Sequence, residues 1–109
     1  VRDRERLVVV CAGREDLFAL EDAVCAGLLL QRLRDDGVEV EGDDGARAAL
    51  ALARVHEVSE GFLASTEAGR ALVAAGLGED LEWCARVDSL AVVPAMKDRT
   101  LVSLSAPGR

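Results

Sequence analysis

The sequence predicts an α/β fold in which helices pack around a small sheet, in the order β-α-α-α-α-β-β. Three observations support this fold class. A continuous apolar run lies near the start of the chain, amphipathic segments rich in Ala and Leu fill its middle, and two apolar stretches separated by a polar turn follow near its end. With 109 residues and 50% hydrophobic composition, the chain is long enough for a single domain with a modest core.

The first element is expected at Leu7–Cys11, a continuous apolar run that includes three valines. Such a run is typical of a strand that is covered on both faces, so we expect a buried central strand. Ala12 and Gly13 follow it as a turn of small residues.

Two long helices are predicted at residues 20–35 and 45–58, flanking this strand. Asp43 or Asp44 is expected to cap the second helix, because a carboxylate there can accept hydrogen bonds from the first free N–H groups. Residues 38–42, between the helices, form either a short edge strand or a loop.

Shorter helical segments are expected in the second half of the chain: a single turn at Phe62–Ala64, a helix capped by Ser65-Thr66 that runs to Ala75, and a helix at Glu79–Val87. In the last of these, Leu81 and Trp83 are expected to face inward.

The final elements are expected to be two strands, Leu90–Pro94 and Thr100–Leu104, joined through the polar turn Lys97-Asp98-Arg99. Pro94 marks an edge strand or a strand end, because proline cannot donate a ladder hydrogen bond. Residues 106–109 are expected to be a frayed tail.

Composition excludes several classes of partner. The net charge of −7 disfavours nucleic acid, and the 3% aromatic content provides no stacking platform for single strands. The apolar stretches are too short to span a membrane, and we expect no membrane partner. Three cysteines without a CxxC pair make a disulfide framework improbable and favour a cytoplasmic location. Association with further copies of the chain stays open.

The acidic pair Glu21-Asp22 is the strongest candidate site, because it stands in the first turn of a helix directly after a small-residue turn. Hard cations prefer carboxylate oxygens, so these residues are predicted Mg²⁺ ligands. The alternative is that both carboxylates only interact favourably with the helix dipole.

Two further groups are predicted to bind an anionic substrate. The first is the backbone of Cys11, Ala12 and Gly13, and the second is the helix start that contains Ser65, Gly69 and Arg70. Simple helix capping is the alternative explanation for the second group.

No catalytic residue is assigned from the sequence. Cys11 and Cys25 lack a histidine partner and are interpreted as small buried apolar side chains. His56, the only histidine, is interpreted as a surface or helix-end residue. The chain contains no G-x-S-x-G motif, Walker A motif, G-x-G-x-x-G motif or zinc-ligand spacing.

Three blocks in order carry a resemblance to a known family. They are V-V-C-A-G followed after a spacer by A-L-E-D-A-V-C-A-G, then S-T-E-A-G-R-A-L-V-A-A-G, then E-D-L-E-W-C-A-R-V-D-S-L-A-V-V-P. Together, over about residues 6–95, they resemble the C-terminal part of the 2-phosphosulfolactate phosphatase, or ComB-like, family. The resemblance implies an α/β, Mg²⁺-dependent phosphatase that converts 2-phosphosulfolactate to sulfolactate in coenzyme M biosynthesis.

The chain departs from the family pattern in two places. Family members begin with a segment of the type D-V-x-R-A-T-T, which is expected to supply an acid and an Arg and is absent from these 109 residues. Many relatives also have His where this chain has Ala68. The resemblance therefore implies that this chain is part of a longer phosphatase, with an N-terminal segment of the same protein as its partner, and is nearly inactive alone. The competing hypothesis is a non-catalytic α/β interaction or oligomerisation domain.

Overall fold

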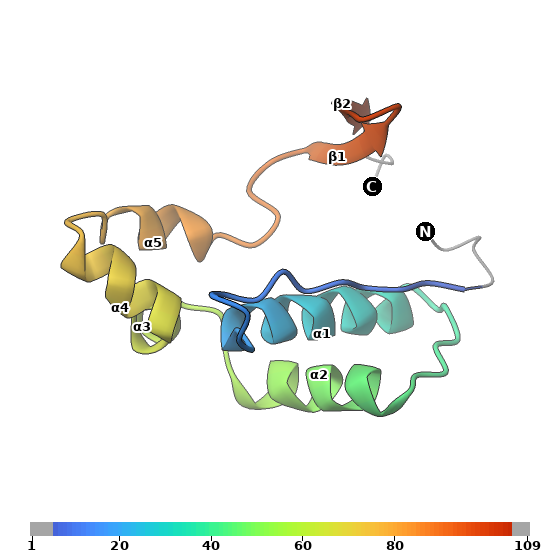
Figure 1. Cartoon of the computed structure of the whole chain (residues 1–109). Coiled ribbons are helices and arrows are strands. Elements are labelled where there is room, and N and C mark those ends of the chain that lie inside the picture. Colours follow the sequence, from blue (N-terminus) through green and yellow to red (C-terminus); the bar gives the residue numbers. More distant parts are fainter. Residues whose placement is uncertain (1–5, 106–109) are drawn as a thin grey trace.

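The computed structural model describes residues 6–105, so the expectations for the charged first residues and for the tail 106–109 lie outside the described residues. It contains five helices followed by a two-stranded antiparallel sheet, which confirms the α/β class (Figure 1). The elements are α1 (Leu20–Asp35), α2 (Asp44–Val55), α3 (Glu60–Ser65), α4 (Glu67–Ala74), α5 (Asp80–Cys84), β1 (Val92–Lys97) and β2 (Thr100–Ser105).

The core lies between α1 and α2. Its buried apolar side chains are Ala19, Ala23, Val24, Ala26, Leu30, Leu33, Ala49 and Leu50. Gly27 allows the two helices to approach closely, because a Cβ atom at this position would collide with the carbonyl oxygen of Ala49. The Asp43 side chain accepts a hydrogen bond from the Ala46 N–H at 2.9 Å and so caps α2.

The predicted central strand is wrong. Residues 7–11 run extended along α1 but form no ladder with either described strand, and their side chains are exposed (Figure 1). A strand requires backbone partners on a neighbouring strand, and β1 and β2 pair only with each other. The helix predicted at 45–58 therefore packs against α1 and does not flank a strand, and residues 38–42 form a loop.

The second half differs from the prediction in detail. The short α5 buries Leu81, as expected, but leaves Trp83 exposed against the Arg86 guanidinium, 4.0 Å from the ring centre. Side chains two positions apart on a helix point to nearly opposite sides, so both cannot face one core. The hairpin turn falls at Asp98 and Arg99, as predicted, and β1 begins two residues later than expected.

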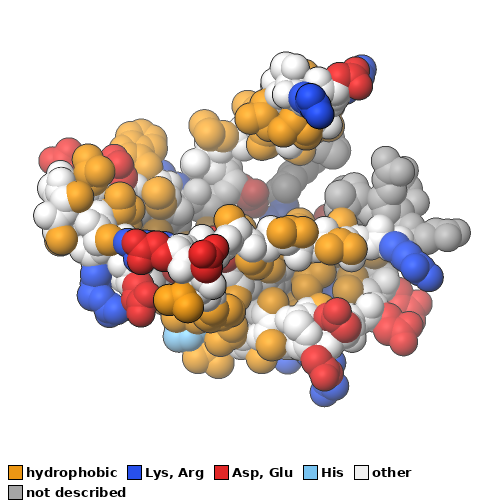
Figure 2. All heavy atoms as spheres, in the orientation of Figure 1, with side chains coloured by type: hydrophobic (Ala, Val, Ile, Leu, Met, Phe, Trp, Pro, Cys, Tyr) orange, Lys and Arg blue, Asp and Glu red, His pale blue; other side chains and the backbone are white. Residues whose placement is uncertain are grey.

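The molecule is open in shape. Its radius of gyration is 15.1 Å, against about 13 Å for a compact domain of this length. The hairpin lies apart from the helices (Figure 1). Apolar side chains are scattered over the visible surface of both regions (Figure 2). None of the helices described, residues 20–84, is long and apolar enough to cross a membrane.

Candidate anion-binding site

The small-residue turn before α1 is held against the helix by Asp22. The Gly13 N–H donates a hydrogen bond to Asp22 Oδ2 at 2.8 Å in a partly buried position. Gly13 has a φ of +72°, and a Cβ atom there would lie 2.6 Å from the Leu17 carbonyl oxygen. Glycine is thus required at this turn for both its conformation and its lack of a side chain.

A tight turn follows directly and carries Arg14. The backbones of Arg14 and Leu17 exchange two hydrogen bonds of 2.9 Å, and the two residues between them have φ values of +51° and +61°. These are the features of a two-residue type I′ turn. The chain thereby reverses direction, so that Leu17 returns beside Arg14 and leads into α1, and Arg14 lines the same cavity as Leu20 and Glu21.

A cavity of about 260 Å³ lies between this turn, the start of α1 and the junction of α3 with α4. Its lining residues are Arg14, Phe18, Ala19, Leu20, Glu21, Ser65, Thr66, Glu67, Ala68 and Arg70. Three of the predicted site residues, Glu21, Ser65 and Arg70, therefore meet around one space although up to 49 positions separate them in the chain. The volume suits a small molecule.

The α3–α4 junction is fixed by Thr66. This buried residue caps α4, with its hydroxyl oxygen accepting from the Gly69 N–H at 3.0 Å and donating to the Leu63 carbonyl at 2.7 Å. The N–H groups of Glu67 and Ala68, at the start of α4, have no hydrogen-bond partner among residues 6–105. Free N–H groups at a helix start attract anions.

Ser65 and Gly69 have roles inside the junction. The Ser65 hydroxyl donates to the Phe62 carbonyl, so its proton is already used. Gly69 is buried, and a Cβ atom there would collide with the Leu63 carbonyl oxygen. Close packing of α3 on α4 thus accounts for this glycine, and its predicted contact with substrate stays a prediction.

The charges around the small cavity are mixed. Arg70 Nη1 donates to the Ser65 carbonyl at 2.8 Å, which positions the guanidinium at the junction. Within residues 6–105, the Arg14 guanidinium makes a single ion pair, a 3.6 Å contact with the neighbouring Glu15. The Glu21 carboxylate forms no hydrogen bond or ion pair with any residue that the structure describes. Two arginines, Arg14 and Arg70, and two glutamates, Glu21 and Glu67, therefore line the same space.

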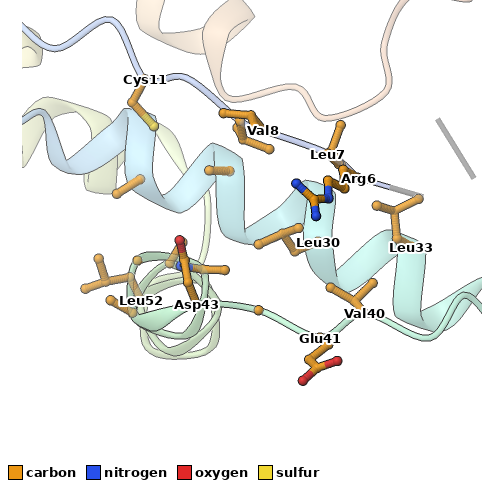
Figure 3. Close-up of a pocket in the computed structure, with 18 of the residues that line it drawn as sticks. Arg6, Leu7, Val8, Cys11, Leu30, Leu33, Val40, Glu41, Asp43 and Leu52 are labelled. Atoms are coloured by element: carbon orange, nitrogen blue, oxygen red, sulfur yellow. The ribbon is translucent and has the colours of Figure 1, made fainter. Parts of the chain in front are cut away.

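Cys11 belongs to a different cavity. It lines a larger groove of about 990 Å³ that runs between the extended segment, α1 and α2 (Figure 3). Ala12, Gly13 and Asp22 line neither space. The predicted site is thus divided: Glu21, Ser65 and Arg70 share the small cavity, while the backbone of residues 11–13 lies outside it.

The described residues do not form a metal centre by themselves. No group of three or more His, Cys, Asp or Glu side chains that could hold a metal occurs within residues 6–105. Asp22 already accepts a hydrogen bond from Gly13, whereas Glu21 lines the small cavity. Since Mg²⁺ takes near-octahedral coordination, this pair supplies at most two of about six ligands.

The remaining candidates have structural positions. His56 follows the last residue of α2, with its ring 5.0 Å from that of Phe62, which confirms it as a helix-end residue. Cys11, Cys25 and Cys84 are free thiols on exposed residues, so the expected burial of the first two is wrong. Arg14 was missed by the sequence analysis, although a basic residue directly after a predicted glycine turn is a usable signal.

Comparison with known proteins places the chain in a family. The family model described as 2-phosphosulpholactate phosphatase matches residues 1–99. A probable 2-phosphosulfolactate phosphatase of Thermus thermophilus is 39% identical over 95 residues, which cover 87% of this chain and 40% of that protein. A protein of the same name from Gloeothece citriformis is 41% identical over 93 residues, covering 80% of this chain and 37% of the relative.

A relative from Symbiobacterium thermophilum, again a probable 2-phosphosulfolactate phosphatase, is 33% identical over 102 residues, covering 90% of this chain and 42% of that protein. The chain thus spans about two fifths of the length of the curated relatives it matches. Since the family model covers most of its residues, the chain belongs to the 2-phosphosulpholactate phosphatase family.

Proposed function

We propose that this chain provides part of the active site of a phosphatase that hydrolyses 2-phosphosulfolactate or a similar small acidic phosphomonoester. In this reaction, water attacks phosphorus, the bond from phosphorus to the ester oxygen breaks, and the products are the alcohol and inorganic phosphate. The observation that carries the proposal is the small cavity, where Arg14, Glu21 and Arg70 meet in a member of this family.

The two arginines of the cavity suit the charge of the proposed substrate, and the two glutamates that line the same space, Glu21 and Glu67, balance them in number. A small acidic phosphomonoester carries a phosphate and a second acidic group, and guanidinium forks bind such oxyanions through paired, charge-assisted hydrogen bonds. Arg14 and Arg70 are the proposed contacts, together with the N–H groups of Glu67 and Ala68. The nucleophile and the general acid are not assigned to any residue of this chain.

Mg²⁺ is the proposed cofactor, and Glu21 and Asp22 are the ligands that this chain would contribute. A bound divalent ion neutralises phosphoryl oxygens and so favours attack by water. Since these two carboxylates fill at most two positions, the proposal requires further ligands from water, substrate or another part of the protein. A cytoplasmic location and a place in coenzyme M biosynthesis belong to the same proposal.

The alternative is a non-catalytic interaction or oligomerisation domain. It predicts that both acidic side chains project over a plain helix surface. Glu21 instead lines a cavity with two arginines, which favours a ligand-binding role.

An NMR titration of the chain with inorganic phosphate tests the anion site. We expect saturable shifts of the backbone amides of Glu67, Ala68 and Arg70, because their N–H groups or side chain border the cavity.

Arg70→Met should weaken phosphate binding about tenfold or more, the cost of one lost charge-assisted hydrogen bond. Arg47→Met is the control and should bind normally, because the Arg47 side chain is exposed on α2 and does not line the small cavity. Shifts scattered over the surface, or equal binding by both variants, would contradict the proposal.

The metal proposal needs a completed chain, in which the part of the Thermus thermophilus relative that this chain does not match is joined to these 109 residues in the order of the relative's own sequence. In that protein, Glu21→Ala and Asp22→Ala should each abolish Mg²⁺-dependent phosphate release. The fold should survive, because an acid in the first turn of a helix contributes only about 0.3–1 kcal/mol through the dipole. Asp22→Ala also removes the hydrogen bond from the Gly13 N–H, worth about 1.5–3 kcal/mol, which loosens the turn before α1 and leaves the α1–α2 core in place. Mg²⁺ dependence that is unchanged in both variants would show that Glu21 and Asp22 are not metal ligands and have only a structural role.

A further inference from the structure

Arg14 lines the small cavity, although it lies outside the sequence stretches that carry the family resemblance. It stands in the spacer between V-V-C-A-G and A-L-E-D-A-V-C-A-G, whereas Arg70 lies inside S-T-E-A-G-R-A-L-V-A-A-G. Both arginines nevertheless border the same space of about 260 Å³. The resemblance therefore assigns no role to Arg14, and its role has to be inferred from its surroundings.

The backbone at Arg14 is fixed by two sets of hydrogen bonds. The backbone groups of Arg14 and Leu17 exchange two bonds of 2.9 Å, and the preceding Gly13 N–H donates to Asp22 Oδ2 at 2.8 Å in the first turn of α1. The Arg14 side chain is 37% exposed, so more than half of it is covered although it stands on a surface turn. A side chain presented from a fixed backbone loses less freedom when it binds a ligand.

The two guanidinium groups use their donors differently. Arg70 Nη1 donates to the Ser65 carbonyl at 2.8 Å, which ties this side chain to the junction of α3 with α4. Within residues 6–105, the Arg14 guanidinium has the 3.6 Å contact with Glu15, whose side chain is 76% exposed. An ion pair with so exposed a partner contributes little stability. The donors of Arg14 are therefore available to a ligand.

The size and charge of the cavity suit a ligand with more than a phosphate group. The volume corresponds to about nine water molecules at about 30 Å³ each, which is more than a lone phosphate group requires. Two arginines balance two glutamates in the lining, and removal of Arg14 would leave one arginine beside Glu21 and Glu67. Because like charges repel, a ligand with two acidic groups depends on both arginines.

We propose that Arg14 determines the substrate specificity of this cavity: Arg70 holds the phosphate, and the Arg14 guanidinium binds a second acidic group, a carboxylate or a sulfonate. The inference rests on the proposed function and narrows its substrate class to phosphomonoesters that carry a second acid. Arg70 is assigned the phosphate because the N–H groups of Glu67 and Ala68 on the same junction add donors for the phosphate oxygens. Arg14 offers one planar fork, which matches two oxygens of a carboxylate or sulfonate.

NMR titration of the chain with two phosphate esters of similar size tests the inference. 2-Phosphoglycolate carries a carboxylate where ethyl phosphate carries a methyl group. We expect the parent chain to bind 2-phosphoglycolate at least about tenfold more tightly, through one additional charge-assisted contact. The net charge of −7 repels the more highly charged ester, so this preference would report a local cation and not the overall field of the protein.

Arg14→Gln should abolish the preference, and Arg14→Lys, which keeps the charge but not the fork, should restore part of it. Arg70→Gln should weaken the binding of both esters to a similar extent and so keep the preference. Arg47→Gln, on an exposed side chain outside the cavity lining, is the control and should bind both esters as the parent does. The amide resonance of Gly13, which donates to Asp22, checks that the turn is intact in the Arg14 variants.

Equal affinity of the parent chain for the two esters would overturn this inference and leave the proposed function standing, because the phosphate group would still be bound. A preference that survives in Arg14→Gln, or that is lost equally in Arg70→Gln, would also overturn it. Binding of neither ester would contradict the proposed anion site itself, so the two failures are distinguishable.

Discussion

The α1–α2 pair and the β1–β2 hairpin have opposite packing. Among the described side chains, almost every buried apolar one lies on or beside α1 and α2, and none of them lies in the hairpin. In the hairpin, Val92, Met96 and Leu101 are all exposed although they are large and apolar. The backbone of each region is nonetheless fully organised, by helical hydrogen bonds in one and by a six-residue register in the other.

The difference shows that local regularity and burial are separate properties. A helix satisfies its backbone within one segment, and the α1–α2 pair then buries small and branched side chains. A two-stranded hairpin satisfies one edge of each strand but is only marginally stable without a covering layer. The helical pair is therefore the self-sufficient part of this chain, whereas the hairpin and the segment at residues 7–10 lack cover within the described residues.

The largest expected effect comes from truncating one leucine side chain in each region and comparing the loss in the free energy of unfolding. Leu30→Ala, in the buried face of α1, should lower the free energy of unfolding by about 3 kcal/mol through lost burial and a residual cavity. Leu101→Ala, in the exposed hairpin, should change it by less than about 0.5 kcal/mol. Urea unfolding followed by circular dichroism measures the free energy of unfolding of both variants. Equal losses of stability would show that the hairpin packs on the core.

A second comparison tests the close helix approach. Gly27→Ala should lower the free energy of unfolding by about 2 kcal/mol, because the added Cβ meets the Ala49 backbone and forces α1 and α2 apart. Gly61→Ala, on α3, has only the Ser59 hydroxyl within reach at 3.9 Å and should be neutral or slightly stabilising. A Gly27→Ala variant as stable as the parent would mean that the two helices are not in tight contact.

The smallest effect concerns the hairpin, whose stability should depend on its turn. Asp98 and Arg99 have φ values of +49° and +64°, which suit Asn-Gly better. Changing both residues, Asp98→Asn with Arg99→Gly, should stabilise the hairpin by about 0.5–1 kcal/mol. The intensity of cross-strand NMR contacts between Ala95 and Val102 would report this gain in hairpin stability. Unchanged contact intensities would show that the turn does not limit hairpin formation.

The sequence predicted the elements whose signals are local. Asp43 and Thr66 cap helices as expected, and the polar turn at Asp98-Arg99 joins two strands. The Leu7–Cys11 strand was wrong as a buried element, because burial depends on partners distant in sequence and no run of apolar residues contains that information.

Only part of the candidate site was predicted, because contacts between parts of the chain that are distant in sequence decide which residues share a cavity. Glu21 and Arg70 were identified from their helix starts, and the fold brings them to one cavity. Arg14 was not identified, because the turn that presents it contains Glu15-Asp16 in place of the usual Asn-Gly signal. Cys11 was grouped with these residues by its neighbourhood in the sequence, yet it lines the other groove.

The central claim is that this chain carries a packed helical core and only part of a phosphatase site. Phosphate release from 2-phosphosulfolactate with Mg²⁺, measured for the 109-residue chain beside the completed chain, tests it most directly. The account predicts almost no release by the short chain and release at least about a hundredfold faster by the completed one, since positioned groups missing from a site cost several kcal/mol of barrier. Equal rates from both would show that the site lies wholly within these 109 residues and would contradict the account.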